Sequence, residues 1–328
     1  MSTQTRDVFL TMGPALGQVE VRVERAAHLD YPIASTVIGD LVRAGGKRLR
    51  PLVLLLAGRA YPHDLDLLVT AAAGIELLHT ASLVHDDTVD HAGLRRGKPT
   101  LNSVLNSGAV ILVGDYLFAQ SAMLAAATES SRVVGIFAAT LADICDGQLR
   151  EMFDAHRLDQ SRQDYERRIF GKTASLFAGS AEMGAVLAGA PESHVQALRG
   201  YGGDLGMAFQ VIDDVLDLRE GSQRLGKPAG QDLRQGTVTL PTMLYAARLA
   251  PGSAEADRLA AVIAGESDDE REIERLIADI RSSGVLDEAT AAAEAFADAA
   301  KARLAVVPDA ETRDLLEDIA DFAVGRRS

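Results

Sequence analysis

Apolar residues recur with helical spacing along nearly the whole of this chain, whereas the strict alternation that is typical of strands is scarce. The helical pattern is interrupted by glycine- and proline-containing stretches, among them AGG (44–46), AGLRRGKP (92–99) and AGAP (188–191). Aromatic residues make up only 5% of the chain, so alanine, leucine and valine must build its interior, which favours close-packed helices over a β-sandwich. We therefore predict an all-α protein.

The helical pattern continues without a low-complexity linker or a shift in charge that would mark a domain boundary. We expect a single domain over residues 1–328, although the length alone would allow two. Its motifs lie between about 38 and 250, and the helices in 251–328 are expected to belong to the same domain.

The net charge of -14 disfavours a nucleic-acid partner, because no basic surplus is present to displace counterions from phosphates. Phosphorylated small molecules stay open as ligands, since they need only a local cluster of cations. The single cysteine, Cys145, excludes an internal disulfide and fits a reducing compartment. Residues 1–17 lack a basic region followed by an apolar core, so we expect no signal peptide and a cytoplasmic protein.

Residues 108–127 form a long apolar stretch that resembles a membrane span. Asp115 and Gln120 interrupt it, and no cluster of lysine or arginine flanks it. We interpret this stretch as a central helix of a large soluble bundle, since buried helices are apolar all round, and expect no transmembrane segment.

Two similar aspartate motifs, HDDTVD (85–90) and IDDVLD (212–217), each follow an apolar helical stretch. Residues four apart on a helix face the same way, so the first and last aspartates of each motif share a face. Like charges among apolar neighbours are unfavourable unless a cation compensates them, and a divalent cation with oxygen ligands, such as Mg²⁺, suits this need. A solvated polar face is the alternative for either motif alone, but it requires the same coincidence twice. The paired residues are Asp86 with Asp90 and Asp213 with Asp217.

Clusters of basic residues occur in glycine-containing segments of a chain that is otherwise acidic. Guanidinium groups bind phosphate oxygens through two hydrogen bonds, and glycine lets the backbone approach. Carboxylates for a metal and cations for phosphate together predict a site for a diphosphate, although ordinary surface charge is the alternative for any one cluster. The clusters are GGKRLRP (45–51), RRGK (95–98), FGKT (170–173) and LGKPAGQD (225–232).

These motifs, in this order, resemble the trans-isoprenyl diphosphate synthases, the polyprenyl synthetase family, of the medium- and long-chain type. LLHTASLVHDDTVDHAGLRRGKPT (77–100) is similar to the first aspartate-rich region of the family, and GMAFQVIDDVLD (206–217) is similar to the second. LGKPAGQDLRQGTVTLP (225–241) resembles the lysine-bearing loop that follows, and the similarity extends to DFAVGRR (321–327). The resemblance implies an isoprenoid synthase fold, which is a helical bundle around a central cavity, and a homodimer.

The resemblance also implies a Mg²⁺-dependent prenyltransferase that condenses isopentenyl diphosphate head to tail with an allylic diphosphate. About three Mg²⁺ ions would be bound per active site with substrate present. Metal ions and basic side chains would stabilise the negative charge of the departing diphosphate, and a dry cavity would protect the allylic cation from water. Loose association with a membrane would help an apolar product to leave.

The resemblance implies a role for each residue of this chain that occupies a position of the family's motifs. The residues that match metal ligands are Asp86, Asp90 and Asp213, with Asp87 and Asp217 completing the two motifs less directly. Lys172 and Asp213, with Asp86 and Asp90, are expected to act in catalysis, as are Thr173 and Gln210, which match polar groups near the developing carbocation.

Basic positions match contacts to the two substrates. Many family members have a lysine that contacts the allylic diphosphate where this chain has Thr237, so that contact is expected to be absent or supplied elsewhere. The residues matching contacts to isopentenyl diphosphate are Lys47, Arg50, His79 and Arg96, and those matching contacts to the allylic diphosphate are Arg95, Lys172 and Lys227.

The helix that precedes Asp86 is predicted to set the product length. Ala81 and Ser82 lie about one helical turn, roughly 5.4 Å, before Asp86, and both are small. Family members that make short products tend to carry a bulky aromatic residue there. We therefore expect a long product of roughly six to ten isoprene units, as in quinone side chains. A geranylgeranyl or farnesyl diphosphate synthase is the alternative, and close helix packing alone would also explain the two small residues.

Three other interpretations have less support. Glu76 and His79 have the ExxH spacing of di-iron carboxylate bundles, but those proteins need two such motifs and this chain has one. A terpene cyclase would replace the second DDxxD motif with an Asn/Ser/Glu-type metal motif, which IDDVLD lacks. A non-catalytic subunit of a heteromeric synthase would have lost its acids, whereas both motifs are present here.

Overall fold

The computed structural model describes residues 3–43, 46–90, 92–95, 98–219 and 229–326. Within these residues the regular secondary structure is helical apart from two antiparallel strands of two residues each, which confirms the prediction of an all-α protein. In chain order the elements are α1 (Thr3–Ala26), α2 (Pro32–Arg43), α3 (Leu49–Arg59), α4 (Leu65–Val89), β1 (Leu94–Arg95), β2 (Lys98–Pro99), η1 (Leu101–Ser103), α5 (Ser107–Ala126), α6 (Ser131–Asp154), α7 (Arg162–Ile169), η2 (Phe170–Ala174), α8 (Ser175–Leu187), α9 (Glu192–Arg219), α10 (Gln231–Arg234), α11 (Leu240–Ala246), α12 (Ala254–Ile263), α13 (Glu270–Ser282), α14 (Val285–Arg303), η3 (Leu304–Val306) and α15 (Ala310–Val324).

The chain forms two compact units. The boundary between them falls inside helices α6, α9, α14 and α15 and at the start of α8. The first unit comprises Met1–Leu141, Leu176–Gly202 and Arg303–Ile319, and the second comprises Ala142–Ser175, Gly203–Ala302 and Ala320–Ser328.

Helix α4 forms the centre of the first unit. It begins at the N-cap Asp64, whose side chain accepts a hydrogen bond from the backbone N–H of Asp66. Its sequence is apolar on nearly every face, which is typical of a helix buried all round, and α1, α3 and α5 all pack against it. Helix α8 reaches α3 closely because Gly184 has no side chain, and a Cβ there would clash with the carbonyl of Leu54.

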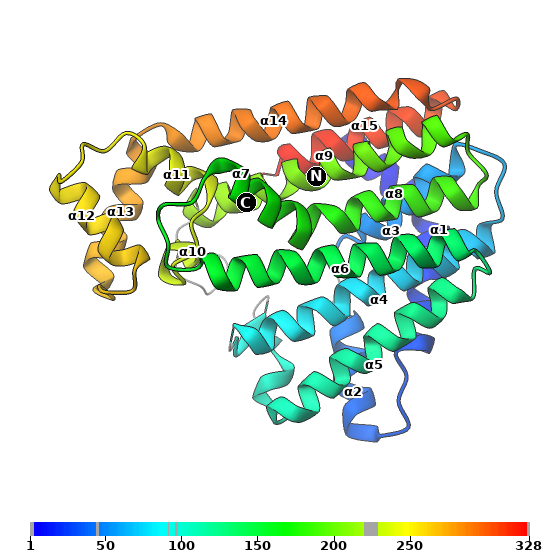
Figure 1. Ribbon diagram of the computed structural model, residues 1–328. Coiled ribbons are helices and arrows are strands. Elements are labelled where there is room, and N and C mark those ends of the chain that lie inside the picture. The colour runs from blue at the N-terminus through cyan, green and yellow to red at the C-terminus, as the bar shows by residue number, and fades with distance from the viewer. Residues whose placement is uncertain (1–2, 44–45, 91, 96–97, 220–228, 327–328) are drawn as a thin grey trace. The chain divides into compact units, whose positions relative to one another are not determined.

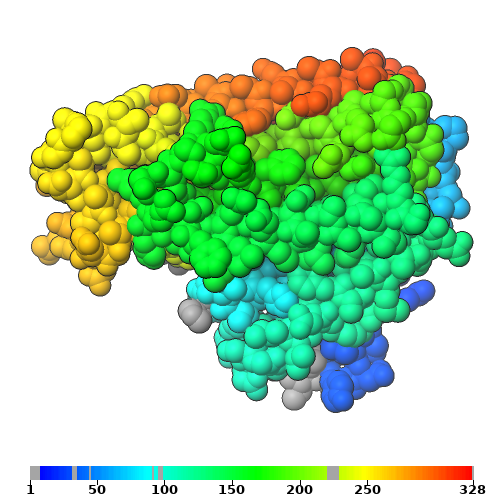
Figure 2. Space-filling view, in the orientation of Figure 1, coloured from blue at the N-terminus to red at the C-terminus, as the bar shows by residue number. Residues whose placement is uncertain are grey.

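Helix α5 lies along α4 in the first unit (Figure 1). The two helices approach closely at Gly74 and Gly114, where a side chain would meet α5 and His85 respectively. Its opposite face is exposed, with Ile111, Leu112 and Met123 between 46% and 69% accessible, and the atoms of α5 lie at the surface in Figure 2. The expectation of a central helix at 108–127 is therefore wrong, because α5 buries one side only.

Two of the described helices are long and apolar enough to cross a membrane when judged by length and composition, namely α4 and α5. In α4, 78% of the most apolar window is buried, whereas in α5 the share is 33%.

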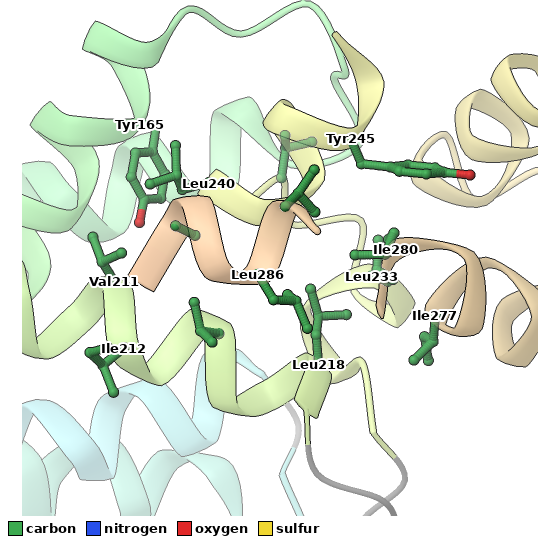
Figure 3. Close-up of a cluster of buried hydrophobic side chains, with 14 of the residues drawn as sticks. Tyr165, Val211, Ile212, Leu218, Leu233, Leu240, Tyr245, Ile277, Ile280 and Leu286 are labelled. Carbon is green, nitrogen blue, oxygen red and sulfur yellow. The ribbon is translucent and has the colours of Figure 1, made fainter. Parts of the chain in front are cut away.

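The second unit has its own apolar core, which surrounds the C-terminal part of α9 (Figure 3). Val211, Ile212 and Leu218 of α9 belong to this core and each is at most 3% accessible. Helices α10, α11, α13 and α14 supply Leu233, Leu240, Ile277, Ile280 and Leu286, and α7 supplies Tyr165. This packing fixes the rotation of α9 and therefore the directions of its polar side chains.

Candidate active site

The first aspartate motif lies at the end of α4. Asp86 is half-buried in the last helical turn, and Asp90 is the exposed C-cap residue, whose N–H donates to the Asp86 carbonyl at 2.8 Å. Asp87, one position on, is only 5% accessible. Residues four apart share a helix face, so Asp86 and Asp90 form one pair of carboxylates and Asp87 points elsewhere.

The turn after this motif is held by hydrogen bonds to the end of α4. The carbonyl of Asp87 accepts from the N–H of Ala92 at 2.9 Å and from the side-chain amide of Asn102 at 2.8 Å. Thr88 donates to the carbonyl oxygen of that same amide at 3.1 Å. The hairpin β1–β2 follows directly, and its backbone contains Arg95. Arg96 and the side chain of Arg95 lie outside the described residues.

Helix α3 brings basic residues to α4 in the first unit. Nη1 of Arg50 lies 3.2 Å from Nε2 of His79. The guanidinium of Arg50 also lies 4.6 Å from the centroid of the Phe177 ring. Two residues predicted to contact isopentenyl diphosphate therefore meet each other. Lys47, a third, is exposed just before α3.

Arg48 anchors the start of α3. It adopts a left-handed backbone conformation with φ of 50°, donates to the carbonyl of Val42 at 2.6 Å and forms an ion pair with Glu76. Both side chains of the pair are buried, with 8% and 6% of their surface accessible. Since Glu76 binds Arg48 and His79 contacts Arg50, the geometry gives the di-iron interpretation no support.

A π-helical turn, η2, presents Lys172 and Thr173 in the second unit. Such turns widen a helix locally and are frequent at functional sites. Gly171 allows the turn to pack on α6, where a Cβ would meet the carbonyl of Asp143. Lys172 forms an ion pair with Glu151 of α6, and the hydroxyl of Thr173 donates to Oε1 of Gln210 at 2.7 Å. Thr173 and Gln210, which match polar groups near the developing carbocation, are thus in direct contact.

Asp214 is the buried member of the second aspartate motif. Its side chain is 4% accessible and accepts from the Tyr165 hydroxyl at 2.7 Å and from Nε2 of Gln210 at 2.8 Å. Burial raises the pKa of Asp214 to about 7, because a carboxylate loses its hydration there, while both donors and the Arg168 guanidinium act to lower this pKa. Burial also raises the pKa of Tyr165 well above its usual value, and the neighbouring Asp214 adds to that rise.

Asp213 precedes Asp214 and binds an arginine from the C-terminal segment. Nη1 of Arg326 donates to Oδ1 of Asp213 at 2.6 Å, and Nη2 donates to the carbonyl of Phe209 at 2.7 Å. The same guanidinium lies 3.7 Å from the centroid of the Phe209 ring. The Asp213 carboxylate therefore faces a position that already accommodates a cation.

Asp217 has a different role from the one its motif position suggests. Its two carboxylate oxygens accept from the N–H groups of Gln231 and Asp232, at 3.0 and 3.1 Å, so it caps the start of α10. Burial, followed by the charge of Asp217, raises the pKa of Asp232 well above its usual value. Lys227 lies outside the described residues, and Thr237 donates its N–H to the Asp232 carbonyl at 2.8 Å.

Four residues of this region were not given a role by the sequence. Asp214 and Asp232 lie inside quoted motifs, so the sequence marked both positions, but the spacing of the motif residues did not indicate what either side chain does. Glu151 lies outside the quoted motifs, whereas Arg326 lies in DFAVGRR (321–327), and only their contacts with Lys172 and Asp213 reveal a role for either residue.

The carboxylates of each unit, taken separately, suit a hard divalent cation. Mg²⁺ usually takes one or two protein carboxylates and completes its shell with water and phosphate oxygens. Asp86 and Asp90 supply two carboxylates on one face, and the Asp213 carboxylate already binds a positive group. Among the described residues no group of three or more acidic, histidine or cysteine side chains is arranged to hold a metal ion alone. The chain therefore fits a metal that shares its shell with a phosphorylated ligand.

An all-helical chain with two aspartate motifs on apolar helices, and with basic side chains on those helices and their neighbours, has the features of an isoprenoid-type prenyltransferase. The sequence pattern of the family described as polyprenyl synthetase matches residues 32–280, and the chain belongs to this family. It is a prenyltransferase.

Known proteins similar to the chain extend over nearly its whole length. It is 39% identical over 312 residues to heptaprenyl diphosphate synthase component 2 of Geobacillus stearothermophilus, which covers 95% of both chains. A crystal structure of polyprenyl synthase from Caulobacter crescentus, complexed with calcium and isoprenyl diphosphate, has a TM-score of 0.93 and 38% identity and covers 99% of this chain and 98% of that one. A decaprenyl diphosphate synthase from Rhodobacter capsulatus has a TM-score of 0.92 and 36% identity and covers 98% of each chain.

Proposed function

We propose that the chain catalyses the head-to-tail condensation of isopentenyl diphosphate with an allylic diphosphate and that it makes an all-trans long-chain product. The observation that carries this proposal is the pair of carboxylates, Asp86 and Asp90, on one face at the end of a buried apolar helix. Acids at that place bind a diphosphate through a cation, and the apolar helix behind them offers a surface to a hydrocarbon chain. The structure solved with calcium and isoprenyl diphosphate supports this ligand class.

In the proposed reaction each set of side chains has one task. Arg50 and His79, with Lys47 beside them, bind the diphosphate of the molecule that is added. Lys172 binds the departing diphosphate and is kept in place by Glu151. The allylic cation is stabilised by Thr173 and Gln210. Arg95, Arg96 and Lys227 are proposed as further diphosphate contacts.

Mg²⁺ is the proposed cofactor, held by Asp86, Asp90 and Asp213, with about three ions per site when substrate is bound. When bound, it would act as a Lewis acid toward the departing diphosphate. The carboxylate of Asp217 is engaged with the start of α10 and Asp87 is buried, so we propose only indirect roles for these two residues.

A direct test incubates the purified protein with isopentenyl diphosphate, a farnesyl or geranylgeranyl primer and Mg²⁺, followed by mass spectrometry of the lipids. We expect a ladder that ends at roughly six to ten isoprene units, and no product when the metal is chelated. A product of three or four units would favour the farnesyl or geranylgeranyl alternative. Absence of any product, with both substrates bound, would favour a non-catalytic subunit.

The proposed length is supported by Ala81 and by the names of two relatives. Ala81 is fully buried and lies on the stripe of α4, with Gly74 and His85, that faces α5. A methyl group at this place leaves more room for a hydrocarbon than an aromatic ring would. The relatives quoted above are a heptaprenyl synthase component and a decaprenyl synthase, both in the proposed range of chain lengths.

Replacing Ala81 with phenylalanine should shorten the product. The ring would project from α4 one turn from Asp86, into the path proposed for the growing hydrocarbon, so elongation should stop after roughly three or four units. Chromatography of the dephosphorylated lipids measures the ladder. Ala125→Phe is a matched control, because Ala125 is buried on α5 beside Gly74, much further along α4 from Asp86. Equal ladders from the two variants would reject Ala81 as the residue that sets length.

We also propose that residues 1–328 act as one domain, that the enzyme is a homodimer, and that it is cytoplasmic with loose membrane association during product release. Helices that carry residues of both units support the first point. The exposed apolar side chains of α5 support the second, since such a surface is suited to a second copy of the chain. One relative is named as component 2, so a heteromeric assembly is the alternative.

A further inference from the structure

A chain of three hydrogen bonds links the second aspartate motif to the π-helical turn. Tyr165 donates to Oδ2 of Asp214 at 2.7 Å, Nε2 of Gln210 donates to Oδ1 of Asp214 at 2.8 Å, and Thr173 donates to Oε1 of Gln210 at 2.7 Å. All four residues belong to the second unit. Tyr165, Asp214 and Thr173 are at most 9% accessible, so little water competes with these bonds.

The direction of every bond in this chain follows from the carboxylate at one end. In its ionised form Asp214 only accepts hydrogen bonds, and its Oδ1 accepts from Nε2 of Gln210, so the amide turns its NH₂ group toward Asp214. Its carbonyl oxygen then faces Thr173, and a carbonyl oxygen can only accept. The hydroxyl proton of Thr173 is therefore committed to Gln210, and the lone pairs of the hydroxyl oxygen are left for another neighbour.

The position of the chain of bonds connects it to the proposed chemistry. Gln210 lies three residues before Asp213 on α9, a spacing at which side chains are neighbours on one helix face. Thr173 directly follows Lys172 in the π-helical turn. The network therefore lies beside a proposed metal ligand and a proposed diphosphate contact.

We propose that Asp214 is a positioning residue that sets the orientation of the Gln210 amide, so that Thr173 presents oxygen lone pairs and not its proton to the allylic cation. This inference rests on the proposed function. Without Asp214 the amide can rotate by half a turn, and the Thr173 hydroxyl could then direct its positive end at a positive centre. Such an arrangement would destabilise the transition state while leaving the binding of both diphosphates intact.

The test compares Asp214→Ala with Tyr165→Phe. The first variant removes the acceptor that orients Gln210, and the second removes the other hydrogen bond to Asp214 without touching Gln210. We expect Asp214→Ala to lower kcat by about 10- to 100-fold with KM for both substrates within about twofold of the starting protein. Tyr165→Phe should keep kcat within about threefold. Equal losses of kcat in the two variants would overturn the proposal.

A double-mutant cycle with Thr173→Val shows whether Asp214 acts through the hydroxyl. If it does, adding Asp214→Ala to Thr173→Val should lower kcat by less than about threefold further, because the group being positioned is already gone. If the decrease in kcat of the double variant is instead the product of the decreases in the two single variants, the proposal is overturned and Asp214 has a general structural role. Thermal unfolding of each variant is measured in parallel, and if Asp214→Ala does not fold, Asp214→Leu, which has similar volume and no acceptor, takes its place in the same cycle. Failure of the proposed function itself would appear separately, as absence of prenyl transfer by the unsubstituted protein.

Discussion

Replacing Asp86 with alanine is expected to lower kcat/KM by about a thousandfold, which corresponds to about 4 kcal/mol of transition-state stabilisation. Asp86 is half-buried in the last turn of α4 and shares a face with Asp90, so its loss leaves one carboxylate where two are proposed to bind metal. The metal that remains would be held less firmly, and charge on the departing diphosphate would be less well compensated. Steady-state kinetics over a range of Mg²⁺ concentrations measure both effects.

Asp115→Ala provides the matched control for this prediction. Asp115 lies on the neighbouring helix α5, 56% of its side chain is accessible, and its Oδ1 is 3.5 Å from Nε2 of His85. The substitution removes the same charge close to the same helix end but no proposed metal ligand, so kcat/KM should stay within about threefold. Near-normal turnover by Asp86→Ala would count against the proposed metal site, whatever the control shows.

Glu76→Gln is expected to lower the free energy of unfolding by about 3–5 kcal/mol. The Arg48 guanidinium that it faces is only 8% accessible, and its second carboxylate neighbour, Glu20, is 3.6 Å away and 56% accessible, so Glu20 compensates the buried charge only in part once Glu76 is neutral. The backbone of Arg48 also has φ of 50°, a left-handed conformation that residues other than glycine keep only when their surroundings enforce it. Urea denaturation followed by circular dichroism measures the change.

Glu311→Gln tests whether any ion pair in the first unit would have the same effect. Glu311 pairs with Arg59 at 2.9 Å, but 65% of its side chain is accessible, so its loss should cost less than about 1 kcal/mol. If the two glutamine variants unfold at the same denaturant concentration, the Arg48–Glu76 pair does not anchor the start of α3.

The fold class and the first aspartate pair could be predicted because both depend on local spacing. Helical periodicity is a property of neighbouring residues, and the i, i+4 relation of Asp86 and Asp90 needs only one helix. The prediction that residues 108–127 form a central helix was wrong because it depends on packing against distant segments, which local spacing does not show. An apolar helix has the same composition whether it is buried on every side or, like α5, on one side only.

Contacts between distant segments could not be predicted in this way. Arg326 binds Asp213 across 113 positions, and no local pattern connects the two residues. The second motif also shows that identical residues at equivalent positions of two similar motifs can have different roles. Asp90 is an exposed helix cap, whereas Asp217, at the equivalent place in its motif, accepts hydrogen bonds from the start of α10. That difference depends on where α10 lies, which the motif does not encode.

Helix α4 and its C-cap residue carry the ion-pair partner of Arg48, the histidine beside Arg50, the small residue proposed to set product length and the first two proposed metal ligands. Successive residues on such a rod are rotated by about 100° and raised by about 1.5 Å, so these groups keep a constant register with one another. Inserting or deleting a single residue between Glu76 and Asp86 would rotate the aspartates relative to Glu76, so that either Glu76 or the aspartates would turn away from the groups they face. Changes of side-chain volume on this helix, in contrast, leave that register intact, so product size can diverge among such enzymes while the chemistry stays the same.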